Sequence, residues 1–161
     1  MPKTRTQNSV DAATSTNPVH AVRDCADALF RAATECCRQH ERVSRLHAKS
    51  NLDEELKVAS EACEQCHDAL RTFAGTYERT AADVHPRGSD EEWWHSANAL
   101  WLASREYLRR TGGCDKASRE LKDHGPDRLD SLHMEYELEG SALLALRHAA
   151  DAYQQNRPTA A

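Results

Sequence analysis

Apolar and polar residues along the first half of the chain repeat with the period of an α-helix. No Gly or Pro occurs from Val19 to Ala74, and apolar or small residues recur at spacings of three and four. The sequence Asn17-Pro18 is typical of a helix start, with a capping side chain followed by proline at the first helical position. The two predicted stripes consist of Val22, Cys25, Leu29, Ala32, Cys36, Val43 and Leu46, and of Leu52, Leu56, Ala59, Cys63, Cys66, Leu70, Phe73 and Tyr77.

Polar residues between these stripes predict a reversal of the chain near Asn51. Asn51 can end one helix, and Asp53, followed by two glutamates, can begin the next. The alternative is a single long helix through residue 50, which would place Cys36 and Cys63 about 40 Å apart at a rise of about 1.5 Å per residue. The two interpretations therefore differ in whether these cysteines can share a site.

The second half of the chain predicts two more long helices. One runs from about Asp90 to Arg110 and ends at Thr111-Gly112-Gly113. Residues 114–124 are expected to form a short helix that Gly125-Pro126 terminates. The last helix covers residues 127–155, with a stripe at Leu129, Leu132, Tyr136, Glu139, Leu143, Leu146, Ala150 and Tyr153.

The tryptophans of the predicted third helix divide between two faces. Trp94, Trp101 and Leu108 lie on one stripe, which we expect to face the core. Trp93 then points elsewhere, and together with Tyr107 it could form an exposed aromatic patch suited to a dimer interface; the alternative, which we expect, is that these aromatic residues fill the core and its rim.

No strand pattern interrupts these helices, so the predicted fold class is all-α. We expect an antiparallel up-down four-helix bundle with a short extra helix between helices three and four. Residues 1–16 are mostly polar and are expected to be a disordered N-terminal tail. Residues 17–157 are expected to form a single domain that is long enough to bury a core.

Composition and charge narrow the classes of function. With 29% charged residues and a formal net charge of −5, the chain lacks the basic excess of a general nucleic-acid-binding protein. Its first residues contain no apolar run, so neither a signal peptide nor a membrane segment is expected. We therefore expect a cytoplasmic protein whose six cysteines are reduced, with no nucleic acid and no membrane as partner.

Cysteine and histidine residues gather at one level of the predicted first hairpin. Cys36 and His40 share a face of the first helix, while Cys63, Cys66 and His67 lie close together on the second. After the reversal, Cys36 is expected to meet Cys66 or His67, and His40 is expected to meet Cys63. Thiolate and imidazole donors in this arrangement predict a metal site for zinc, or for copper in its soft state.

The sequence Cys63-Glu64-Gln65-Cys66-His67 is also a Cys-x-x-Cys-His motif, the pattern used for covalent haem attachment. Residues 60–73 resemble the haem-binding helix of the cytochromes c′, which are four-helix bundles. The resemblance implies thioether links through Cys63 and Cys66 with His67 as the axial iron ligand. It thus implies a redox protein that carries haem c.

A third interpretation needs no ligand. Cysteine packs as a small apolar residue and is among the residue types most often buried, so these cysteines can simply fill a core. The protein would then be a helical interaction or oligomerisation module, with a homodimer or another protein as its partner. The sequence does not decide whether the protein is an enzyme. A non-enzymatic role is favoured, because no Gly-rich phosphate loop or Gly-x-Ser-x-Gly sequence occurs.

Overall fold

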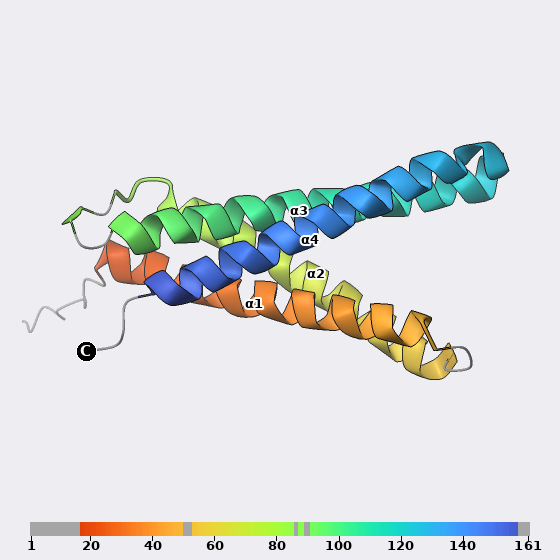
Figure 1. The fold of residues 1–161 in the computed structure, drawn as a ribbon. Helices are drawn as coiled ribbons and strands as arrows, with labels where there is room; N and C mark the ends of the chain where they lie inside the picture. Colours follow the sequence, from red (N-terminus) through yellow and green to blue (C-terminus); the bar gives the residue numbers. More distant parts are fainter. Residues whose placement is uncertain (1–16, 50–52, 86, 89–90, 158–161) are drawn as a thin grey trace, which may run out of the picture.

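The computed structural model describes residues 17–49, 53–85, 87–88 and 91–157, and these residues are almost entirely helical (Figure 1). No strand occurs among them, so the all-α class is confirmed. The predicted N-terminal tail, residues 1–16, lies outside the described residues. The elements are α1 (Pro18–His47), α2 (Asp53–Ala81), α3 (Glu91–His124), the 3-10 turn η2 (Pro126–Arg128) and α4 (Leu129–Asn156).

Helices α1 and α2 form a hairpin, as the polar residues between their stripes predict. The side chain of Asn17 caps α1 by accepting a hydrogen bond from the backbone N–H of Val19 at 3.1 Å. Near the start of α1, the Cys25 thiol donates to Oγ1 of Thr80, close to the end of α2, at 3.6 Å. The chain therefore reverses between α1 and α2, and the single-helix alternative is wrong; Asn51 itself lies outside the described residues.

Helix α3 is continuous through Gly112 and Gly113, so the predicted break and the separate short helix at residues 114–124 are wrong. Two adjacent glycines weaken a helix, but α4 packs alongside this part of α3 and supports it. At Gly113 a Cβ atom would lie 2.5 Å from Oε2 of Glu135, the flexible end of a side chain of α4 that lies against this glycine. Gly125, with φ of 81°, does end the helix as predicted, and η2 leads directly into α4.

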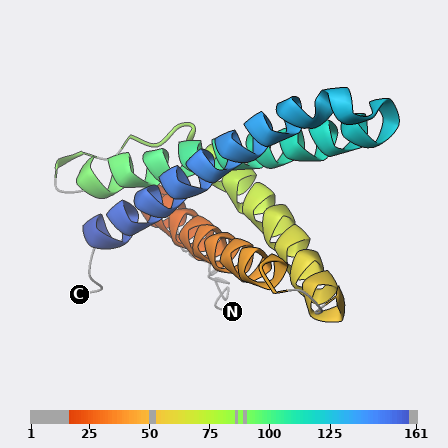
Figure 2. The ribbon, with the colours of Figure 1, turned by 45° about the vertical axis from the view of Figure 1, so that its right-hand side comes forward.

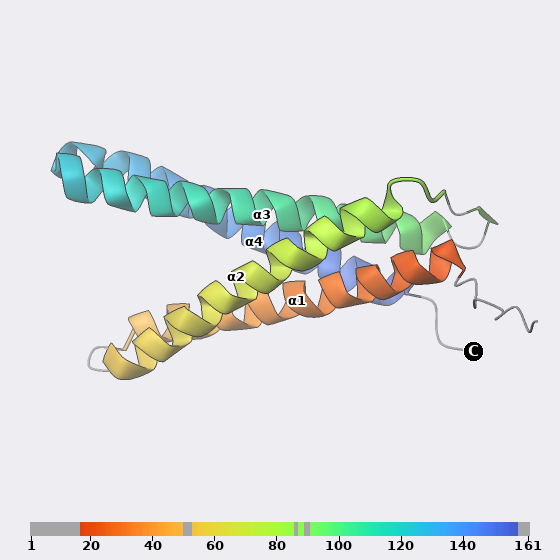
Figure 3. The ribbon, with the colours of Figure 1, turned by 180° about the vertical axis from the view of Figure 1, so that it is seen from behind.

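The four helices form two hairpins that lie together at one end and diverge toward the other (Figures 1 and 2). The hairpin of α3 and α4 extends past the point where it meets α1 and α2, and the same divergence is visible from behind (Figure 3). Predicted core positions near the diverging ends are accordingly exposed, with Leu129 at 43% and Tyr136 at 51%. No helix in the described ranges combines the length and the apolar character needed to cross a membrane.

The core face of α3 is shifted by one position from the predicted stripe. Trp93 and Tyr107 are both fully buried, which rules out the exposed aromatic patch, whereas Trp94 and Trp101 are only partly buried. Helix α3 packs against α2 and α4, and its buried face runs through Trp93, Leu100 and Tyr107.

Candidate functional site

Two cysteine thiols face one another across the hairpin of α1 and α2. Cys36 of α1 is fully buried, Cys66 of α2 is half-buried, and the two thiols lie close enough for each to affect the pKa of the other. Burial raises the pKa of the Cys36 thiol far above its usual value, and the nearby Cys66 and Cys63 thiols raise it further. The pKa of Cys66 is also raised, chiefly by desolvation. Both sulfur atoms are therefore protonated at neutral pH.

One turn away, Cys63 and His67 form a second contact on the same face of α2. The Cys63 sulfur lies 3.6 Å from Nε2 of His67, and burial raises the pKa of this thiol to about 11. The same Nε2 atom lies 3.0 Å from the phenolic oxygen of Tyr107 on α3. Burial lowers the pKa of His67, so its imidazole is neutral at pH 7 and keeps a nitrogen lone pair for a proton or a metal ion.

Tyr107 connects the two histidines of the predicted site. Its hydroxyl lies 3.3 Å from Nδ1 of His40, and both imidazole rings meet the phenol ring edge-on. A phenol has one hydrogen, so it donates to one imidazole and accepts an N–H bond from the other. His40 and His67 therefore belong to one hydrogen-bonded group with Tyr107 at its centre, although they come from different helices.

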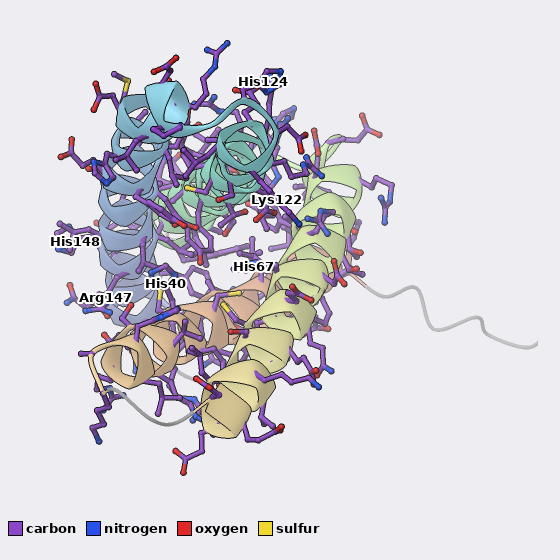
Figure 4. All side chains as sticks on the ribbon, turned by 90° about the vertical axis from the view of Figure 1, so that its right-hand side faces the viewer. His40, His67, Lys122, His124, Arg147 and His148 are labelled. Atoms are coloured by element: carbon purple, nitrogen blue, oxygen red, sulfur yellow. The ribbon has the colours of Figure 1, made fainter. Side chains whose placement is uncertain are left out.

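A cleft of about 380 Å³ opens beside this group, where the two hairpins diverge (Figure 4). His40 and His67 lie in the space between the hairpins in this view. The opposite wall carries Glu139 of α4, whose pKa is raised by burial and whose Oε2 accepts a hydrogen bond from the Cys114 thiol at 3.5 Å. Further polar lining comes from Ser44, Ser60, Glu64, Thr111, Asp115 and Tyr136.

The predicted metal ligands thus come together as two pairs. Cys36 meets Cys66, as expected, and Cys63 meets His67. His40 lies on the other side of the Tyr107 hydroxyl, and its predicted contact with Cys63 is replaced by this shared hydrogen bond. Within the described ranges, no three His, Cys, Asp or Glu side chains are arranged to hold a metal ion as they stand. The metal-ligand roles of these residues remain predictions.

The Cys-x-x-Cys-His motif lies within α2, and its two thiols have different neighbours. Cys66 contacts Cys36 in the interface with α1, whereas Cys63 lies against His67 at the edge of the cleft. A haem attached through both sulfurs would need them to face one porphyrin edge, with His67 free to bind iron. In the present contacts Nε2 of His67 is bonded to Tyr107, so binding of haem iron or of another metal ion through this atom requires that contact to break.

Comparisons with known proteins identify no relative of this chain. No family model, curated protein or solved structure matches the chain. The functional interpretation therefore rests on the residues and their geometry.

Tyr107 is the central residue of the site that the sequence pattern missed. Its spacing from Leu100 and Trp93 would have placed it on a buried stripe, but the alternative stripe through Trp94 and Trp101 carries two tryptophans and is equally apolar in pattern. The half-buried Glu139 is a clearer signal, since a carboxylate on a core stripe is uncommon.

Proposed function

We propose that the hairpin of α1 and α2 binds a soft metal ion, Cu(I) in preference to Zn²⁺, in a reducing cytoplasm. The single observation that carries the proposal is the proximity of the Cys36 and Cys66 thiols, which lie close enough across the hairpin for each to affect the pKa of the other. Thiolates select soft ions, and Cu(I) accepts two or three of them, whereas Zn²⁺ prefers four ligands in a tetrahedron. A site that begins from two facing thiols is therefore better suited to Cu(I).

The electrostatics of the thiols support the proposal. The pKa values of Cys36 and Cys63 are raised partly by the neighbouring sulfurs, because ionised thiolates in this cluster would repel one another. A cation held between thiolates removes this repulsion and replaces the protons. Binding should therefore release protons and become tighter as the pH rises.

Further ligands are within a turn of the facing pair. Cys63 is the third sulfur donor, and His67 can supply a nitrogen once Nε2 leaves the Tyr107 hydroxyl. We place His40 outside the first coordination sphere, where its bond to Tyr107 would orient the phenol. A change of side-chain rotamers without movement of the helices is the rearrangement that this proposal requires.

The test is a titration of the reduced protein with Cu(I) in competition with a chromophoric chelator, repeated with Zn²⁺. We expect one tightly bound Cu(I) per chain, and at least a tenfold loss of affinity for Cys36→Ser and for Cys66→Ser. Cys25→Ser is the matched control, because Cys25 is a half-buried thiol of the same hairpin whose sulfur donates to Thr80. Equal affinities for all three variants, or no competition with the chelator, would rule the site out.

A second candidate function, a protein-interaction module, is favoured by exposed apolar side chains on α4. Leu144 is 53% exposed and Met134 is 61% exposed, in the helix that also carries the exposed Leu129 and Tyr136. Scattered exposed apolar residues are common on monomers, so association must be measured directly. Light scattering of the wild-type protein and of Met134→Glu would separate a dimer, which the variant should weaken, from a monomer.

We also infer an antiparallel up-down four-helix bundle as the architecture of the chain. Hydrogen bonds between Tyr77 and Asn98 and between Asp27 and Tyr153 support it, because each joins positions expected to be level in neighbouring antiparallel helices. Distances between spin labels at Arg45 and Lys122, at the diverging ends of the hairpins, would test how far the bundle closes in solution.

A further inference from the structure

A groove between α2 and α3, on a face separate from the cysteine cluster, gathers three arginines. The two helices cross here (Figure 3), and the groove has a volume of about 350 Å³. Its lining includes Arg71, Ala74, Gly75 and Glu78 from α2 with Arg105 and Arg109 from α3. In a chain with a formal net charge of −5, this is a local concentration of positive charge.

Two of these arginines form ion pairs on the exposed surface, and the pair of Arg109 with Glu106 is bidentate. Arg71 pairs with Asp68 at 2.6 Å and Arg109 with Glu106 at 2.7 Å, but all four side chains are at least 44% exposed. Exposed ion pairs of this kind contribute about 0 to 1 kcal/mol. Glu106 also pairs with Arg110 at 2.7 Å, so it keeps a cationic partner when Arg109 turns toward the groove.

Arg105 is positioned by an aromatic ring. Its guanidinium carbon lies 5.0 Å from the ring centroid of Trp101, a cation–π contact that holds the side chain over α3. Its ion pair with Glu78 is longer than the other two, at 3.6 Å. Glu78 is the one carboxylate in the groove lining, and it would oppose an incoming anion.

Gly75 has no side chain and therefore leaves space at the bottom of the groove. A glycine inside a helix costs about 1 kcal/mol relative to alanine, so a packing reason is expected for it. A Cβ atom at Gly75 would meet only the flexible end of Arg79, at 3.4 Å, so contacts within the described residues do not require glycine here. Together with Ala74, Gly75 leaves room between the arginine side chains.

We propose that this groove binds the phosphate group of a small phosphorylated molecule. Guanidinium groups match the oxygens of a phosphate with paired hydrogen bonds, and a bound phosphate would compete with Asp68, Glu78 and Glu106 for the three arginines. The volume lies at the small end of the range of ligand pockets and suits a phosphate with a short organic group. The proposal is independent of metal binding by the cysteines.

The experiment is a titration of the ¹⁵N-labelled protein with phosphoserine at low ionic strength, with serine and inorganic phosphate as separate probes. We expect phosphoserine to shift the amide signals of residues 71–78 and 105–109, serine to shift none, and phosphate to act more weakly at the same residues. Because the charges are exposed, added salt should weaken binding. No saturable shift with phosphoserine or phosphate would overturn the proposal.

Variants separate a specific site from general charge attraction. Arg105→Gln and Arg109→Gln should each weaken phosphoserine binding by about tenfold, and Glu78→Gln should strengthen it. Arg119→Gln, on α3 but outside the groove, is the matched control and should have no effect. Gly75→Ala should raise the melting temperature and still weaken binding, a combination that loss of folding cannot produce. Equal losses for Arg105→Gln and Arg119→Gln would contradict the proposal.

Discussion

The phenolic oxygen of Tyr107 lies 3.0 Å from Nε2 of His67, so α3 and α2 are joined by a hydrogen bond beside the cysteine cluster. Tyr107 is fully buried, and its hydroxyl also reaches His40 on α1. One side chain thus links three helices at the point where the two hairpins begin to diverge.

Tyr107→Phe should lower stability and raise metal affinity together. Loss of the hydroxyl leaves two imidazoles without this partner and should cost about 1 to 2 kcal/mol in the free energy of unfolding. It also frees Nε2 of His67, so Cu(I) should bind more tightly than to the wild type. Urea unfolding and the chelator competition measure the two effects.

Tyr153→Phe is the control for that variant, since Tyr153 is a buried tyrosine whose hydroxyl donates to Asp27, away from the cysteines. A similar loss of stability with unchanged Cu(I) affinity is expected. If Tyr107→Phe and Tyr153→Phe changed metal binding alike, His67 would not be a ligand.

Substitution of glycines tests the continuity of α3. At Gly112 a Cβ atom would meet nothing within 4 Å, so Gly112→Ala should stabilise the protein by about 0.5 to 1 kcal/mol. At Gly125, with φ of 81°, alanine is strained, and Gly125→Ala should destabilise it by about 1 kcal/mol. Thermal unfolding of the two variants provides the comparison. Destabilisation by Gly112→Ala would indicate a turn at that position.

The lowered pKa of His67 predicts a loss of stability in mild acid. Burial keeps this imidazole neutral in the folded protein below its ordinary value of 6.5, while the unfolded chain takes up a proton there. The unfolded state then binds more protons, so stability should fall as the pH drops from about 6.5 toward the folded pKa.

His67→Asn should flatten this part of the pH profile of unfolding. His133→Asn, at an exposed position of α4, should leave it unchanged. An identical slope in wild type and His67→Asn would show that His67 is protonated equally in both states.

Ionisation of Glu139 should make stability depend on pH in the opposite direction to His67. Its raised pKa means that the folded protein prefers the protonated carboxyl, so stability falls as the pH rises from 4.5 through the folded pKa. Glu139→Gln should therefore stabilise the protein at pH 8 by a few tenths to about 1 kcal/mol, since partial exposure screens the effect. The gain should vanish at pH 4, and the exposed Glu137→Gln should show none of it.

The helical elements were largely predictable from the sequence, because strong periodicity and clear end signals agreed. Asn17-Pro18 begins α1 and Gly125 ends α3, and the Cys36–Cys66 contact followed from the reversal between the first two stripes. The break at Gly112-Gly113 failed because glycine preference is a local quantity, and the packing of α4 against α3 outweighs it.

The site was less predictable, since it depends on contacts between helices that are distant in sequence. Choosing between the stripes of Trp93 and Trp94 requires knowing which neighbours α3 has on each side, and this choice decided whether Tyr107 was inside. Periodicity within one helix carries no information about the divergence of the hairpins. The cleft beside His40 and His67 depends on that divergence, so it could not be inferred from the sequence pattern.

Because the two hairpins meet at one end and diverge at the other, a small rotation between them would displace their far ends by a larger distance. About 20 residues of α3 lie beyond Ser104, a length of about 30 Å at the usual helical rise. A rotation of about ten degrees at the shared end would move the far tip by about 5 Å. A small change in packing around Tyr107 would thus be amplified into a large change in the separation of Lys49 and His124.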